Sequence, residues 1–251
     1  MEIYVKNFRE GALGILEFGN PYGNSLNQKS ITELNEQLLD LNADKKVKVI
    51  ILQSAGENAF CGGASFTEMK KFKTLGQATK FFMGLSNLIN TLRTLSKFVV
   101  ARIQGRVVGG GVGLVAACDY AIAHKDASIK LSELSIGIGP YVIEPVVSRR
   151  IGFSAFTQLS INAENWKNSK WALDKGLYAD VVENEDELDK KLDEITKRIS
   201  KYSPTAVRKL KKLHWKNTDH WESLLSKNAE ITAKLILGQD SQEILKTLNS
   251  K

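Results

Sequence analysis

Apolar and polar positions follow two different spacings in the first part of the chain. Residues 1–18 alternate apolar and polar side chains around Gly11 and Gly14, which predicts an opening β-hairpin. Residues 28–43 instead place apolar side chains at positions 31, 34, 38 and 41. That spacing lies on one face of a helix and predicts an amphipathic α-helix.

Short apolar runs then alternate with helical patterns. The runs at 47–54 and 98–103 predict strands, and the amphipathic segment 75–95 between them predicts a helix. A further small apolar segment, 112–123, predicts a helix directly after three glycines. Strands that alternate with helices are typical of an α/β fold.

The second half of the chain predicts mainly helices. Loop residues become fewer there and amphipathic patterns follow one another closely. The expected helices cover residues 154–176, 185–202, 204–213, 219–237 and 240–248.

Composition indicates an ordinary globular protein. The chain has 251 residues, of which 43% are hydrophobic and 25% are charged, enough for one large domain or a domain with an appendage. The start of the sequence shows no secretory signal, and no run reaches the roughly eighteen apolar residues of a membrane span. Cys61 and Cys118 lie in small apolar surroundings without metal-ligand spacing. We therefore expect a reduced, cytoplasmic protein with no metal site and no disulfide.

The formal charge of +7 is concentrated between residues 197 and 216. Such a run is typical of a solvated helix face, although a basic patch also attracts phosphate groups, including those of nucleic acids. Trp215 and Trp221 are spaced as core or interface residues rather than as platforms for bases. Nucleic-acid binding is therefore the less favoured interpretation.

Two glycine-rich turns carry the candidate chemistry. Gly109, Gly110 and Gly111 stand between a predicted strand and a predicted helix, where backbone N–H groups lack intrahelical partners and face a negative charge favourably. A similar turn, CGGAS at 61–65, follows the other predicted strand. The two turns could present two N–H groups to one developing oxyanion. Glu133, a lone acid beside Leu131, Leu134 and Ile136, is a candidate general base whose pKa burial would raise.

These motifs resemble those of the crotonase superfamily, the enoyl-CoA hydratase/isomerase family. The resemblance rests on FCGGASFTEM at 60–69 and on GRVVGGGVGLVAACDYAIAHKDASIKLSELSIGIGP at 105–140, and it continues over nearly the whole chain. It implies an α/β fold, a spiral of repeated ββα units over 1–195. It also implies a C-terminal helical oligomerisation region over 196–251 and a homotrimer or hexamer.

The resemblance further implies an acyl-CoA thioester substrate, with coenzyme A present as part of the substrate and no other cofactor. The N–H groups of Ala64 and Gly110 would polarise the thioester carbonyl, and Glu133 would move the proton. Some of the basic residues would lie near the phosphates of coenzyme A. The expected substrate-binding residues are Leu26, Gly62, Ser65, Phe66, Gly109, Gly113, Pro140 and Tyr141.

One departure from the family pattern decides between reactions. Hydratases of this family carry a second glutamate three residues after the middle glycine, and this chain has Gly113 there. A single carboxylate suits a proton shuttle between C2 and C4, so double-bond isomerisation is favoured. Two alternatives stay open: an enoyl-CoA hydratase, including one for a branched substrate such as methylglutaconyl-CoA, and a non-catalytic CoA- or RNA-binding homologue.

Overall fold

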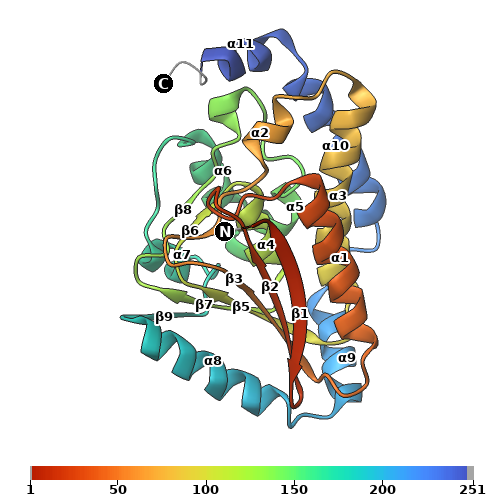
Figure 1. Ribbon diagram of the computed structural model, residues 1–251, viewed down its shortest axis with the longest axis vertical. Coiled ribbons are helices and arrows are strands. Elements are labelled where there is room, and N and C mark those ends of the chain that lie inside the picture. Colours follow the sequence, from red (N-terminus) through yellow and green to blue (C-terminus); the bar gives the residue numbers. More distant parts are fainter. Residues whose placement is uncertain (1, 248–251) are drawn as a thin grey trace.

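Two β-sheets form the centre of the molecule (Figure 1). The structure is a computed structural model that describes residues 2–247. The six-stranded sheet has the order β1-β2-β3-β5-β7-β9, with strands Tyr4–Glu10, Leu13–Gly19, Val49–Ser54, Phe98–Ile103, Tyr120–His124 and Asp180–Val182. The three-stranded sheet has the order β4-β6-β8, with strands Ala59–Cys61, Arg106–Val108 and Ile129–Lys130. β1 and β2 pair in the antiparallel sense, as the predicted hairpin requires, while the other strand pairs given for residues 2–247 are parallel.

The chain winds between the two sheets in a repeated order. Each of the pairs β3–β4, β5–β6 and β7–β8 gives its first strand to the large sheet and its second to the small one. Helices follow each pair: α2 (Phe66–Met69) and α3 (Leu75–Thr94), then α4 (Gly110–Ala117), then the 3-10 helix η1 (Leu134–Ile136) and α5 (Glu144–Ile151). The predicted α/β spiral of ββα units is therefore confirmed.

The first predicted helix has the expected boundaries and buried face. α1 (Gln28–Ala43) begins after Asn27, whose side chain accepts a hydrogen bond from Ser30 N at 2.7 Å. Such a cap satisfies one of the free N–H groups of the first turn. The helix buries the four apolar positions of the predicted stripe: Ile31, Leu34, Leu38 and Leu41.

Two predicted helices have the wrong extent. The segment 112–123 is helical only to Ala117, because Cys118 takes an extended conformation and the chain continues as β7. Residues 154–176 form two helices, α6 (Phe153–Ile161) and α7 (Ser169–Asp174). Asn168 starts the second of these by accepting a hydrogen bond from Trp171 N at 2.8 Å. The small apolar residues of 112–123 and the asparagine-rich loop within 154–176 show no clear hydrophobic periodicity, so the pattern did not mark these boundaries.

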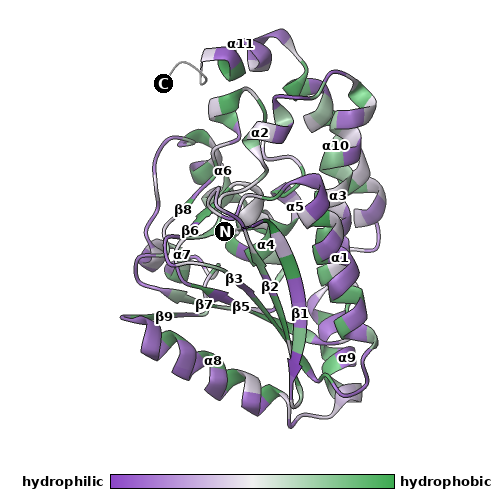
Figure 2. Ribbon diagram, in the orientation of Figure 1, coloured by the Kyte–Doolittle hydropathy of each residue, from purple (hydrophilic) through white to green (hydrophobic). Residues whose placement is uncertain are grey.

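The C-terminal helices share the core of the rest of the chain. They are α8 (Glu185–Ile199), α9 (Pro204–His214), α10 (Trp221–Ile236) and α11 (Gln239–Thr247). α8 covers one face of the large sheet through Leu188, Leu192 and Ile195, and α10 packs along α3 with its apolar side in the main core. In Figure 2 the strands β2, β3 and β5 of the large sheet are mainly hydrophobic, while the outer side of α8 is hydrophilic. The boundary predicted between 195 and 196 falls within α8, and the trimer or hexamer stays a prediction.

The basic stretch has a partly structural role. Lys211 is 1% exposed, and its Nζ donates to Asp119 Oδ2 at 2.7 Å and to Lys97 O at 2.9 Å. The Lys211 ammonium group therefore holds α9 against the start of β5 and the residues that follow α4. The interpretation of Lys211 as part of a solvated helix face is corrected. Within residues 2–247, none of the helices combines the length and apolarity that crossing a membrane requires.

Candidate active site

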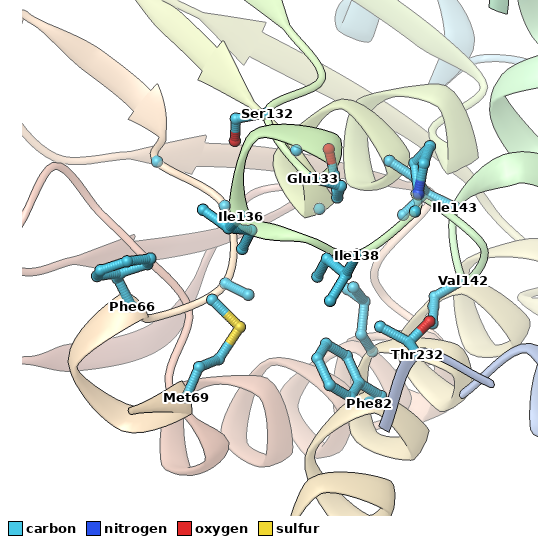
Figure 3. Close-up of a pocket in the computed structure, with 18 residues that line it drawn as sticks. Phe66, Met69, Phe82, Ser132, Glu133, Ile136, Ile138, Val142, Ile143 and Thr232 are labelled. Carbon is cyan, nitrogen blue, oxygen red and sulfur yellow. The ribbon is translucent and has the colours of Figure 1, made fainter. Parts of the chain in front are cut away.

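A cavity of about 130 Å³ lies where the two glycine turns meet Glu133. Its lining is apolar except for Glu133, Ser132, Thr232 and the backbone of the turns. Figure 3 places Glu133 between Ser132 and Ile143, across the cavity from Met69, Phe82 and Thr232. The lining comes from the two glycine turns, α2, α3, the segment that follows β8, and α10.

The first glycine turn presents the N–H of Ala64. Leu26 lies beside it as a short parallel bridge: Leu26 N donates to Gly63 O at 2.7 Å, and Ser65 N donates to Leu26 O at 2.7 Å. These two bonds engage the Gly63 carbonyl and the Ser65 N–H, which flank the Ala64 N–H in sequence. Within the described part of the chain, Ala64 N–H has no hydrogen-bond acceptor. Gly63 has φ +82° and its Cβ position lies 2.8 Å from Val108 O, so glycine is required there.

The second glycine turn presents the N–H of Gly110. Gly109 N donates to Lys130 O at 2.8 Å, while Gly109 O accepts from Val112 N at 2.8 Å. Gly110 is the first residue of α4, and its N–H has no acceptor among residues 2–247. The partial positive charge at the N-terminus of α4 strengthens the attraction of this N–H group for a negatively charged oxygen.

The backbone nitrogens of Ala64 and Gly110 lie close together at the cavity. A Cβ on Gly63 would lie 3.6 Å from Gly110 N, and a Cβ on Gly110 would lie 3.8 Å from Ala64 N. The two turns are therefore in direct backbone contact, with Ala64 and Gly110 both in the lining. Paired, fixed donors of this kind stabilise an oxygen that gains negative charge.

Glu133 is held against the second turn in a desolvated position. Its Oε1 lies 2.9 Å from the Cβ position of Gly109, whose φ is +51°, so a larger residue at 109 would displace the carboxylate. Oε2 is buried, and no hydrogen-bond partner for it exists among the described residues. Burial raises the pKa of Glu133 from 4.5 to about 7. A carboxylate with this pKa can both accept and return a proton near neutral pH.

Among the residues that the structure describes, Glu133 is the one titratable group in the lining of this cavity. Where a second glutamate would extend from position 113, Ile143 fills the space: a Cβ on Gly113 would lie 2.3 Å from Ile143 Cγ2. Ile143 is 1% exposed and belongs to the main core. No carboxylate can therefore enter from position 113 without rebuilding this wall.

The structure places the predicted site residues in two groups. Seven line the cavity: Gly62, Ala64, Phe66, Gly109, Gly110, Glu133 and Pro140. Four do not line it, and their contact with substrate stays a prediction. Leu26 is buried behind the first turn, and Ser65 accepts from Glu68 N to cap α2. Gly113 lies behind Ile143, and Tyr141 is 41% exposed.

Sequence reasoning missed most of the apolar wall. Phe82 and Leu85 come from the buried face of α3, which the amphipathic pattern of that helix could have indicated. Thr232 comes from α10, about a hundred residues from Glu133 in sequence, and no local signal marks it. Leu134 was expected to bury Glu133 but is 56% exposed. Ile138 and Ile143 line the cavity around Glu133 instead, and Leu134 does not.

The raised pKa predicts a measurable stability cost. Between pH 4.5 and 7 the folded state keeps a proton on Glu133 that the unfolded chain releases, so folding loses stability as pH rises through this window. The cost is complete above pH 7 and absent below 4.5. We expect Glu133→Gln to be more stable than the parent at pH 8 by about 3 kcal/mol and equally stable at pH 4.

Urea unfolding at both pH values measures this difference. Glu164→Gln is the control, because Glu164 is exposed and outside the lining. An equal gain for both variants, or a gain that does not change with pH, would contradict the desolvated position of Glu133.

Comparison with known proteins points to one family. The family model described as enoyl-CoA hydratase/isomerase matches residues 9–247. A short-chain-enoyl-CoA hydratase of Clostridium acetobutylicum is 32% identical over 202 residues, which cover 80% of this chain and 76% of that protein. A peroxisomal Delta(3,5)-Delta(2,4)-dienoyl-CoA isomerase of Arabidopsis thaliana is 27% identical, over 82% of this chain and 78% of that protein. The crystal structure of enoyl-CoA hydratase from Bacillus halodurans superposes with a TM-score of 0.91 at 23% identity, covering 97% and 99% of the two chains.

Proposed function

The chain belongs to the enoyl-CoA hydratase/isomerase family and is an enzyme of that family, and on this basis we propose that it isomerises a short 3-enoyl-CoA to the conjugated 2-enoyl-CoA. One observation carries the choice of reaction. Ile143 occupies the space beside Gly113, and among residues 2–247 Glu133 is the one titratable side chain in the lining. A reaction that one carboxylate can complete is therefore favoured over one that needs two.

The first step removes a proton from C2 of the substrate. The C2–H bond breaks, its proton passes to the Glu133 carboxylate, and its electron pair is delocalised over the adjacent double bond and the thioester carbonyl. The carbonyl oxygen of this dienolate becomes negative and is held by the N–H groups of Ala64 and Gly110. Each such donor contributes roughly 3–4 kcal/mol to the stability of the charged intermediate.

The second step returns the same proton to C4. The neutral Glu133 carboxylic acid donates its proton, the electron pair forms the C4–H bond, and the double bond now lies between C2 and C3. Atoms and charge balance without water, and Glu133 ends as the carboxylate that began the cycle. Its pKa of about 7 suits both directions of transfer near neutral pH.

Product analysis tests the reaction. Incubation with a six-carbon 3-enoyl-CoA is expected to give a product of unchanged mass whose double bond is conjugated with the thioester, as ultraviolet absorbance and mass spectrometry detect. An unconsumed substrate, under conditions where the protein is folded, would refute the proposal and favour a binding-only homologue.

Acyl size and charge give a prediction of specificity. A dry engineered cavity of about 150 Å³ holds one benzene molecule, so the cavity of about 130 Å³ suits acyl groups of about six carbons or fewer. The described part of its lining holds no cation to compensate a second carboxylate. We expect kcat/KM for uncharged four- to six-carbon 3-enoyl-CoAs to exceed that for ten-carbon or carboxylated analogues by roughly tenfold or more, since 1.4 kcal/mol is tenfold.

Phe82→Leu is the matched variant for this comparison. It enlarges the wall of the cavity and should shift the preference toward longer chains while leaving the discrimination against carboxylated chains in place. Equal kcat/KM values across chain length in the parent would contradict the size limit, and faster turnover of a carboxylated substrate would favour a methylglutaconyl-type hydratase.

A further inference from the structure

One wall of the cavity is tied at both ends to the C-terminal helices. Residues 137–141, here called the wall segment, follow Glu133 closely, and Ile138, Gly139 and Pro140 within it line the cavity. Ser241 Oγ, on α11, donates to Gly137 O at 2.8 Å. Asn228 Nδ2, on α10, donates to Tyr141 O at 2.8 Å. Two side chains from the end of the sequence therefore hold the two ends of a wall formed in its middle.

Both ties are buried and closely packed. Ser241 is 1% exposed and Asn228 is 8% exposed. Gly137 has φ +78°, and its Cβ position lies 2.5 Å from Ser241 Oγ and 2.9 Å from Ser241 Cα. α11 therefore sits directly on the backbone of the wall segment. Buried polar groups with satisfied hydrogen bonds fix one arrangement, because breaking them leaves a buried donor or acceptor unpaired.

The tie at Gly137 acts within one turn of Glu133. Ile136 N donates to Glu133 O at 3.2 Å and Ile138 N donates to the same oxygen at 3.1 Å, so the wall segment and the backbone of Glu133 form one hydrogen-bonded turn. The tie at Tyr141 acts two residues before Ile143, the side chain that fills the space beside Gly113. α10 also reaches the cavity itself through Thr232, whose Oγ1 donates to Asn228 O at 2.9 Å.

We propose that Asn228 and Ser241 are positioning residues, which hold the wall segment so that the Glu133 carboxylate stays pressed against Gly109 and shielded from water. This inference rests on the proposed role of Glu133. Neither residue lines the cavity, so each acts through the wall and not on the substrate. Around Glu133 the nearest charged residues along the chain are Lys130, at the end of β8, and Glu144, at the start of α5, and neither lines the cavity.

The test removes each of the two hydrogen bonds to the wall segment and compares the effect with that of removing a similar buried hydrogen bond elsewhere. Ser241→Ala and Asn228→Ala delete the donors to the wall segment, and Ser241→Thr keeps a hydroxyl. Ser86→Ala is the control, because Ser86 Oγ donates to Leu225 O at 3.0 Å and so ties α10 to α3 and not to the wall segment. Ser86 is 1% exposed, like Ser241, so both serine variants lose a buried hydrogen bond of the same kind.

We expect Ser241→Ala and Asn228→Ala to lower kcat by roughly tenfold or more, because small displacements of a catalytic group are costly, while KM changes less. The acid limb of the kcat/KM profile should move to lower pH, since water that reaches Glu133 restores its ordinary acidity. Ser241→Thr should recover most of kcat, and Ser86→Ala should change neither kcat nor the acid limb. Equal losses in all the alanine variants with an unchanged acid limb would overturn the inference.

A second readout does not depend on activity. The stability gain from Glu133→Gln at pH 8 relative to pH 4, measured in the Ser241→Ala background, should shrink by at least half. An unchanged stability gain in the Ser241→Ala background would mean that the Ser241 hydrogen bond does not shield Glu133 from water. A parent enzyme that adds water instead of isomerising would refute the proposed reaction alone, because this stability comparison would still decide the role of Ser241.

Discussion

Glu133→Gln is expected to lower turnover of a short 3-enoyl-CoA by roughly 10²–10⁴-fold, the usual contribution of a positioned general base. Glutamine has nearly the same shape but cannot accept and return the proton. No other titratable side chain within residues 2–247 lines the cavity to replace it. KM should change little, because the oxyanion donors and the apolar wall remain. Steady-state kinetics at pH 8, where Glu133 is ionised in the parent, measure the loss.

Glu144→Gln is the matched control for this prediction. Glu144 begins α5, close to Glu133 in sequence but outside the cavity lining. Its replacement should leave turnover near the parent value. Retained turnover in Glu133→Gln, with the fold intact, would remove Glu133 as the base and with it the single-carboxylate mechanism.

Gly110→Pro is expected to lower kcat by roughly 10²–10³-fold, the typical loss of one oxyanion donor. Proline removes the N–H that we assign to the thioester oxygen. It is tolerated at the first position of a helix, because that N–H has no intrahelical partner. Gly110 holds this position in α4, directly after Gly109 at φ +51°. The loss should therefore be in turnover, with thermal stability much less affected.

Phe153→Pro tests whether proline itself causes the loss. Phe153 is the first residue of α6, follows Gly152 at φ +82°, is 68% exposed and does not line the cavity. This variant should keep both turnover and stability. If Gly110→Pro also kept its turnover in a folded protein, the assignment of the Gly110 N–H to the oxyanion would be wrong.

Local patterns predicted the elements that carry clear periods. The opening hairpin, α1 and α3 combine apolar and polar positions, and such periods show which face is buried. The two central strands, β3 and β5, were indicated by short apolar runs. The segment 112–123 consists almost wholly of small apolar residues, so helix and strand spacings fit it equally well. Its division at Cys118 is set by tertiary contacts, in which Asp119 Oδ2 accepts from Val99 N and from Lys211 Nζ.

The residues that carry the candidate chemistry could be predicted from the sequence, whereas most residues that shape the cavity could not. Glycines that need positive φ or close backbone contact marked both turns, and a lone acid among apolar residues marked Glu133. The residue that fills the space beside Gly113 is Ile143, thirty positions later in sequence, and no periodicity links the two. The ties from Asn228 and Ser241 are equally non-local. Pairings between distant segments shape the cavity, and they became visible only in the folded chain.

The most direct measurement compares two substrates of the same chain length. Purified protein is incubated separately with a six-carbon 2-enoyl-CoA and a six-carbon 3-enoyl-CoA, and the products are identified by mass. With Ile143 beside Gly113 and Glu133 as the lone carboxylate, the 3-enoyl-CoA should be conjugated without change of mass, much faster than the 2-enoyl-CoA gains water. Faster formation of a water adduct would contradict the account. Hydration would need a second group to hold the attacking water, and the described lining of this cavity offers no second carboxylate for that role.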